Sequence, residues 1–411
     1  MDKTGIYISG LGQSVHQESI EKYAMRIKNE LSYNNTGVKY EMKTERIFYT
    51  QDRESTVVSI LKSKNGTKDE LVYKLYDFQY HEILTEKFKR KNLLVKNLIL
   101  FGLIIRKFPQ IILRIFTSGG FDRPYLTFYA FMLLLLISLA IIFLIPVSID
   151  YVSQSYISLN LPAYIQVLLD KIKCYLDQYL RHCPFFSIFL VKIKEWLVPV
   201  TTFILLVVPE SKTLITSLAT EFACVDKYIG NGEQSQLILG NLDLLIEYIA
   251  EHEPNSEIHY HCYSFGSIIA MDLLFPIGTI PSTNTQTKSK LFITIGTPYE
   301  FINAYYPRFY NNRSPLMVNA LTWYNIYSVA DALATNFRKD MERGPAEFGI
   351  KDLGHKPENI NYEITSDKKL SLFNFLTMDS IHMHKCYWDT SPNGQSCMRL
   401  LFQKMKQQHF I

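Results

Sequence analysis

The stretch HYHCYSFGSIIAMD, residues 259–272, decides how the chain is interpreted. Its first half is apolar and aromatic, as in a buried strand, its second half is typical of a helix, and Ser264 lies between them. A strand, a tight turn and a helix in this order present a serine hydroxyl as a nucleophile. The alternative is a small residue that simply ends a strand. We predict the first, so Ser264 is the candidate nucleophile.

The residues two before and two after Ser264 test this interpretation, because the turn leaves little space beside the serine. Gly266 has no side chain and meets the requirement. Cys262 stands where a Gly-x-Ser-x-Gly pattern has its first glycine, and a cysteine is small enough to be tolerated there. We therefore expect the turn to form with Cys262 in place of a glycine.

The composition is that of a folded chain with a large apolar content. Of 411 residues, 47% are hydrophobic and 20% are charged, which is too apolar for disorder and predicts a substantial core. The net charge of +4 is mild, so we predict no nucleic-acid partner. The six cysteines form no C-x-x-C pair and no regular framework, so reduced thiols are expected.

Strands alternate with helices on both sides of a long central segment, which predicts an α/β fold with a mostly parallel sheet and helices on both faces. In the first helix, apolar residues recur at helical spacing after a potential cap at Ser19. They are Ile20, Tyr23, Ala24, Ile27 and Leu31. The predicted strands are 5–9, two within 55–78 joined by an Asn-Gly turn, 257–263, 290–298, 321–331 and 361–366; the helices are 18–31, 241–254 and 265–275.

The central segment has the character of a membrane-associated insert. Basic and apolar residues intermingle in 86–116, as in a helix that lies in a membrane interface. Residues 126–147 carry no charge and are long enough to cross the bilayer as a helix, although a buried helix of a soluble domain is the alternative. A second apolar stretch, 196–209, is shorter.

The order of the segments limits the topology of this insert. If strands on both sides of it belong to one sheet, the number of crossings is even. Residues 126–147 and roughly 185–208 then form a hairpin with a short segment outside, or both lie as re-entrant or surface elements. Basic residues cluster before residue 124, which places that flank on the cytoplasmic side. We divide the chain into a first part of the core (1–84), a helical insert with transmembrane or re-entrant helices (85–210) and a second part of the core (211–411).

Three further motifs accompany Ser264, and together with it they resemble the α/β-hydrolase family over roughly residues 3–80 and 215–390. YISGLGQ (7–13) is similar to the oxyanion loop of the family, with Ser9 where a histidine is more usual. WYNIYSVAD (323–331) is similar to the strand end that presents the acid of the triad, and HKCYW (384–388) to an H-x-x-Y-W ending.

This resemblance implies an α/β-hydrolase fold and a role for each matched residue. Asp331 would be the acid and His384 the base, which with Ser264 gives the chain order Ser, Asp, His of the family. The backbone N–H groups of Leu11 and Phe265 would bind the developing oxyanion.

Other residues compete for these roles. His382 is two residues from His384 and is an alternative base, and Asp340 is an alternative acid in a charged run that fits a solvated face. The H-x-H pairs 259/261 and 382/384 are potential metal ligands, but neither has a third clustered ligand with an acidic partner. We predict neither a metal nor a cofactor.

These features predict a membrane-associated serine hydrolase that cleaves an ester or thioester, in the manner of a lipase or carboxylesterase. Its substrate would be a lipid or acyl ester delivered from the bilayer, because inserts between the two halves of such a core commonly cover the site. The core would lie on the cytoplasmic side of the membrane. The alternatives are an acyltransferase that uses the same triad, and an inactive membrane scaffold that keeps the fold.

Overall fold

The structure is a computed structural model, in which the chain divides into two compact units. The first contains Met1–Arg90, Gln110–Ala130 and Thr220–Ile411, and the second contains Lys91–Pro109 and Phe131–Ala219. The residues that the structure describes are 2–11, 18–35, 37–63, 69–91, 93–116, 163, 167, 171, 174, 221–230, 232–340, 342–363 and 383–411.

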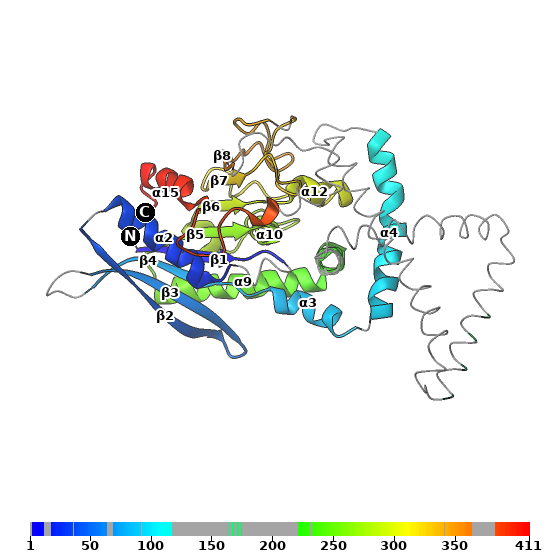
Figure 1. The fold of residues 1–411 in the computed structure, drawn as a ribbon, viewed down its shortest axis with the longest axis horizontal. Helices are drawn as coiled ribbons and strands as arrows, with labels where there is room; N and C mark the ends of the chain where they lie inside the picture. Colours follow the sequence, from blue (N-terminus) through cyan, green and yellow to red (C-terminus); the bar gives the residue numbers. More distant parts are fainter. Residues whose placement is uncertain are drawn as a thin grey trace. The chain divides into compact units, whose positions relative to one another are not determined.

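Eight strands of the first unit form one mixed sheet in the order β2-β3-β4-β1-β5-β6-β7-β8 (Figure 1). Strands β4, β1, β5, β6, β7 and β8 run parallel to one another, whereas β3 is antiparallel to both β2 and β4. The predicted α/β class with a mostly parallel sheet is therefore confirmed. The strands are β1 (Asp2–Ile8), β2 (Lys39–Thr50), β3 (Arg53–Ser63), β4 (Glu70–Asp77), β5 (Ser256–Tyr263), β6 (Ser289–Ile295), β7 (Thr322–Tyr327) and β8 (Glu358–Asn361).

Helices cover both faces of this sheet. His261 in β5 contacts Tyr23 in α2, and since successive side chains alternate along a strand, its neighbour Tyr260 points to the opposite face. On that opposite face α9 and α10 pack against each other. The helices with described bounds are α2 (Ile20–Asn34), α3 (His81–Lys89), α4 (Leu93–Phe116), α9 (Glu233–His252), α10 (Phe265–Leu274), α11 (Thr283–Lys288), α12 (Tyr299–Tyr305), the 3-10 turn η1 (Met383–Lys385) and α15 (Met398–Gln407). Residues 221–230 are helical as well.

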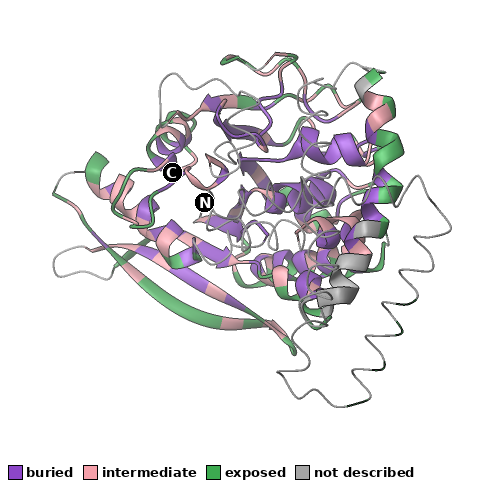
Figure 2. Cartoon of the chain, turned by 45° about the vertical axis from the view of Figure 1, so that its right-hand side comes forward, coloured by how far each residue is buried: buried purple, intermediate pink, exposed green. Residues whose placement is uncertain are grey.

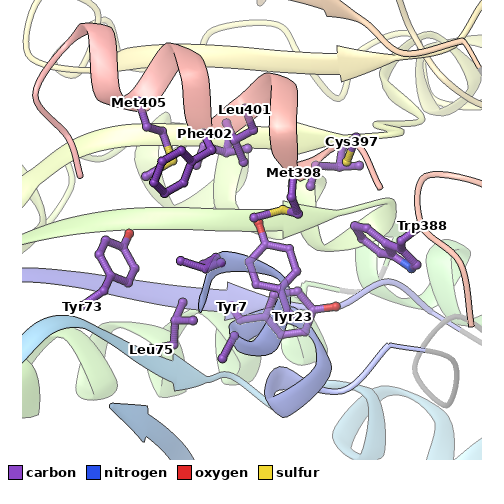
Figure 3. Close-up of a cluster of buried hydrophobic side chains, with 14 of the residues drawn as sticks. Tyr7, Tyr23, Tyr73, Leu75, Trp388, Cys397, Met398, Leu401, Phe402 and Met405 are labelled. Atoms are coloured by element: carbon purple, nitrogen blue, oxygen red, sulfur yellow. The ribbon is translucent and has the colours of Figure 1, made fainter. Parts of the chain in front are cut away.

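Helix α2 forms as its sequence pattern predicts. Ser19 is the cap, and its side chain accepts a hydrogen bond from the Lys22 N–H. The five apolar residues of the predicted face are all buried. Helix α2 and helix α15 cover one face of the sheet. Figure 3 shows the buried cluster there, which joins side chains from the first and last parts of the chain. Its labelled members are Tyr7, Tyr23, Tyr73, Leu75, Trp388, Cys397, Met398, Leu401, Phe402 and Met405.

Two strands differ from the sequence prediction. β2 (Lys39–Thr50) was not predicted, because most of its residues are polar and exposed (Figure 2). It forms through a long antiparallel pairing with β3 and not through an apolar pattern of its own. The last strand is Glu358–Asn361, and not 361–366 as predicted; it pairs with β7 from Tyr324 to Tyr327.

The predicted insert lies mostly outside the described residues. This applies to both apolar stretches, 126–147 and 196–209, so their membrane prediction remains a prediction. The basic, apolar segment 86–116 does form a helix over most of its length, α4, which contains Pro109. Within the described part of the chain, none of the helices combines the length and the apolar character that a membrane crossing needs.

A buried network of two histidines and two tyrosines lies between β1, β4, β5 and α2. The Tyr73 hydroxyl is 2.8 Å from both His259 Nδ1 and His261 Nε2, and the Tyr23 hydroxyl is 2.9 Å from His261 Nδ1. Burial lowers the pKa of His259 to about 3 and that of His261 well below its ordinary value. Both rings are therefore neutral, and three of their four nitrogens bond to phenols. The H-x-H pair 259/261 therefore forms hydrogen bonds inside the core of this structure.

This network makes stability depend on pH. Because both histidines have a folded-state pKa below their ordinary value of about 6.5, the unfolded chain binds more protons once the pH falls below 6.5. Between pH 7.5 and 5.5 each histidine should lower the free energy of unfolding by about 1.4 kcal/mol. Urea unfolding at pH 7.5 and 5.5 measures the effect, and His259→Asn should remove about half of it. Because burial also raises the pKa of Asp77 to about 7, which opposes the histidine effect in this range, the comparison is between the wild type and the variant. The same pH dependence in His259→Asn as in the wild type would contradict the assignment.

Candidate active site

Ser264 lies on a strained turn between β5 and α10. Its backbone angles are φ 51° and ψ −124°, in a region that residues with a side chain rarely adopt. The turn is held by hydrogen bonds on both sides: the Ser264 N–H donates to the Ile295 carbonyl at 2.8 Å, and the Ser264 carbonyl accepts from the Ser267 N–H at 3.0 Å. The predicted strand, turn and helix are therefore present.

The two positions flanking the serine are restricted as expected. A Cβ at Gly266 would lie 2.3 Å from the carbonyl oxygen of Ile8 and 2.6 Å from that of Ser9, so only glycine fits without movement of the backbone. Cys262 is fully buried in the sheet, where it pairs with Ile8 in β1. Its small side chain is thus accommodated by the core in the place of a first glycine.

Three of the predicted site residues meet at one edge of the sheet. His384 Nε2 is 2.8 Å from Ser264 Oγ, and His384 Nδ1 is 2.8 Å from Asp331 Oδ2. Ser264 follows β5, Asp331 follows β7, and His384 belongs to the short turn η1. These side chains come from distant parts of the sequence, and they form a continuous chain of hydrogen bonds.

The surroundings of Asp331 determine how the imidazole is used. The carboxylate is buried, and three donors satisfy it: His384 Nδ1, the Tyr387 hydroxyl at 2.9 Å and the Leu333 N–H at 2.9 Å. A carboxylate only accepts hydrogen bonds, so the His384 ring carries its proton on Nδ1. Its Nε2 is then free to accept the proton of the Ser264 hydroxyl.

The segment that carries His384 is fastened by aromatic and ionic contacts. The ring of Tyr263 stacks on that of His384, with 5.6 Å between centroids, and its hydroxyl donates to the His384 carbonyl. Arg26 is buried against Glu18 and donates to the carbonyls of Asp389 and Ser391. The backbone that carries the imidazole is therefore fixed by hydrogen bonds at His384 itself and at Asp389 and Ser391.

The loop that carries Asp331 is fastened in a similar way. Glu363 accepts a hydrogen bond from the Val329 N–H at 2.9 Å and lies 3.3 Å from the Ser328 hydroxyl. The Ser328 N–H donates to the Tyr387 hydroxyl at 3.2 Å. The loop between β7 and Asp331 is thus tied to the segment that carries the histidine.

The predicted oxyanion donors lie at the carboxyl ends of adjacent strands. Leu11 comes just after β1, Phe265 begins α10 directly after Ser264, and β1 pairs with β5 up to Ile8 and Cys262. The close approach of Gly266 to the end of β1 brings these two backbone segments together. Their role in binding an oxyanion remains a prediction.

The competing residues have different outcomes. Asp340 forms a bidentate ion pair with Arg338, at 2.8 Å for each bond, and is not part of the hydrogen-bond chain. His382 lies outside the described residues, so the pair 382/384 is not described together, whereas His384 Nε2 is 2.8 Å from Ser264 Oγ. Among the described residues, no group of three or more histidine, cysteine or acidic side chains is placed to hold a metal ion.

Sequence reasoning missed three contributors to the site, Tyr387, Glu363 and Gly296. Tyr387 was visible only as part of the motif 384–388, and nothing in that motif predicts which group its hydroxyl bonds. Gly296 follows β6 with a φ of 59°, and a Cβ there would lie 2.9 Å from the ring of Tyr387, so the position requires a glycine.

Comparison with protein-family models, curated proteins and solved structures found no match. The chemistry of the site is therefore inferred from the positions of its own residues. The decisive features are the strained serine, the oriented imidazole and the buried carboxylate.

The space at Gly266 gives a test of the turn. Gly266→Ala places a methyl group against the backbone of β1, so it should destabilise the chain by about 1–3 kcal/mol. The matched control is Gly240→Ala in α9, where nothing lies within 4 Å; there the change should stabilise by up to about 1 kcal/mol. Urea denaturation of both variants measures the difference. Equal effects of the two substitutions would show that the turn has space to spare.

Proposed function

We propose that this chain is a serine hydrolase of the α/β-hydrolase type that cleaves an ester or thioester. The observation that carries the proposal is the hydrogen-bond chain from Ser264 through His384 to Asp331, with 2.8 Å at each step. Its geometry is that of a nucleophile, a base and a group that orients the base. The positive φ of Ser264 on the turn between strand and helix supports the same function.

The first half of the reaction forms an acyl-enzyme. His384 Nε2 takes the proton of the Ser264 hydroxyl as Oγ attacks the carbonyl carbon, and the buried Asp331 carboxylate stabilises the imidazolium that results. The N–H groups of Leu11 and Phe265 are the proposed donors to the oxyanion, each worth about 3–4 kcal/mol when well aimed. The imidazolium then protonates the leaving alcohol or thiol, and the C–O or C–S bond breaks.

The second half releases the acid. His384 removes a proton from water, the resulting hydroxide attacks the acyl carbon, and the Ser264 oxygen leaves with a proton from the imidazolium. An alcohol in the place of water would give acyl transfer by the same steps. The enzyme returns to its starting state, and no metal or cofactor takes part in the proposed sequence.

We place the substrate among lipids and acyl esters, at a membrane with the core on its cytoplasmic side. The support is the uncharged stretch 126–147 and the apolar residues that α4 exposes. The large apolar residues that α4 exposes are Ile105, Phe108, Leu113 and Phe116. Large exposed apolar side chains on one helix suit contact with acyl chains.

Labelling with a fluorophosphonate probe tests the proposed function. The probe phosphonylates a serine hydroxyl only when a base activates it, so the wild type should be labelled and Ser264→Ala should not. His384→Ala and Asp331→Asn should lower the labelling rate by at least about 10³-fold, as expected when a triad loses its base or its orienting acid.

The matched control is Asp340→Asn, which removes the competing carboxylate and should be labelled at the wild-type rate. In-gel fluorescence of membrane fractions provides the measurement, with circular dichroism to verify that each variant is folded. Equal labelling of the wild type and Ser264→Ala would contradict the assignment of Ser264 as the nucleophile, and the absence of labelling from the wild type would favour an inactive scaffold with the same fold. Product analysis with and without an added alcohol then separates hydrolysis from acyl transfer.

A further inference from the structure

Asp331 Oδ2 accepts two hydrogen bonds, and only one of them comes from the base. His384 Nδ1 donates at 2.8 Å and the Tyr387 hydroxyl donates at 2.9 Å to the same oxygen. The Tyr387 oxygen in turn accepts the Ser328 N–H at 3.2 Å, so its single proton is directed at the carboxylate. The second donor is part of a fixed arrangement.

Tyr387 is held so that it donates at every pH of interest. Its side chain is buried, with 1% of the residue exposed, so water does not compete for the hydroxyl. Burial, and next the negative charge of Asp331, raise the pKa of Tyr387 well above its ordinary value of 10. The phenol therefore stays protonated throughout the working range of a histidine base.

The backbone around Tyr387 is shaped to keep the ring in this place. Gly296 has φ 59°, and a Cβ there would lie 2.9 Å from the Tyr387 ring and 3.2 Å from His384 Cε1. The aromatic rings of Tyr263 and Tyr362 lie 6.3 and 6.2 Å away between centroids. The ring is confined on several sides, so the hydroxyl has little freedom to leave Asp331.

We propose that Tyr387 is a positioning residue of the hydrolase reaction: its hydroxyl orients the Asp331 carboxylate toward His384 and disperses the carboxylate charge. This inference rests on the function proposed above. A donor on Oδ2 fixes the side chain in the orientation that the imidazole needs. It also draws negative charge from the oxygen, so the carboxylate attracts the imidazolium less strongly and the ring stays a neutral base to lower pH.

The sign of the effect follows from this charge dispersal. The acid-side midpoint of kcat/KM marks the pH at which the free enzyme loses its neutral base. Without the phenol proton, the carboxylate is more negative and favours the imidazolium, so the midpoint moves to higher pH. A residue that only fills space would leave the midpoint where it is.

Tyr387→Phe tests the proposal, because it keeps the ring and removes only the hydroxyl. With a short-chain p-nitrophenyl ester as substrate, kcat should fall roughly tenfold, as for the loss of one hydrogen bond to a charged group. The acid-side midpoint of kcat/KM should rise by about half to one pH unit. The full chain is used, and its melting temperature is measured alongside.

The matched control is Tyr263→Phe, which removes a neighbouring hydroxyl that bonds the His384 carbonyl and not Asp331. This variant should slow the reaction without moving the midpoint. A Tyr387→Phe enzyme with the wild-type midpoint and kcat would overturn the proposal, as would an equal midpoint shift in both variants.

A second readout separates this proposal from the proposed function. The His384 Nδ1 proton, shared with Asp331, should give a downfield proton NMR resonance that Asp331→Asn abolishes. Tyr387→Phe should move this resonance further downfield, because the carboxylate becomes a stronger acceptor. If the resonance moves but the wild type and Ser264→Ala hydrolyse the ester equally, the proposed function is contradicted and the effect of Tyr387 on Asp331 is supported. If the resonance does not move, only the proposed role of Tyr387 is contradicted.

Discussion

The structure of the site depends on the turn at Ser264, where the backbone passes from β5 into α10 against the end of β1. Gly266 has no space for a side chain, and Ser264 adopts a backbone conformation that costs on the order of 1–3 kcal/mol. The buried strand before the turn and the fully buried helix after it hold this conformation in place. In this conformation the Ser264 hydroxyl lies 2.8 Å from His384 Nε2.

The parallel direction of β5, β6 and β7 brings the residues of the site together. Their carboxyl ends meet at one edge, so the residues that follow them come together although they are far apart in the sequence. Ser264 follows β5, Gly296 follows β6 and Asp331 is four residues beyond β7. His384 comes from a segment outside the sheet, and hydrogen bonds of Tyr263, Arg26 and Tyr387 fasten this segment to the rest of the unit.

Much of this arrangement could be predicted from the sequence where a local pattern encodes it. The turn around Ser264, the buried face of α2 with its cap, and the order of Ser264, Asp331 and His384 all correspond to short motifs. β2 could not be predicted in this way, because its partner β3 stabilises it and its own residues are mostly exposed and polar.

The role of Tyr387 and the pairing of His259 and His261 with tyrosines are invisible in the sequence for another reason. Both depend on which side chains the fold places within hydrogen-bond distance of each other, and these come from β4, α2 and loops far from them in the chain.

The central position of β1 in the sheet has a consequence for the chain during its translation. One edge of β1 pairs with β4, but its other edge pairs with residues 256–262, which the ribosome adds much later than either strand. A nascent chain therefore exposes an open strand edge for much of its synthesis, and such an edge invites binding by a chaperone or wrong pairing with another chain.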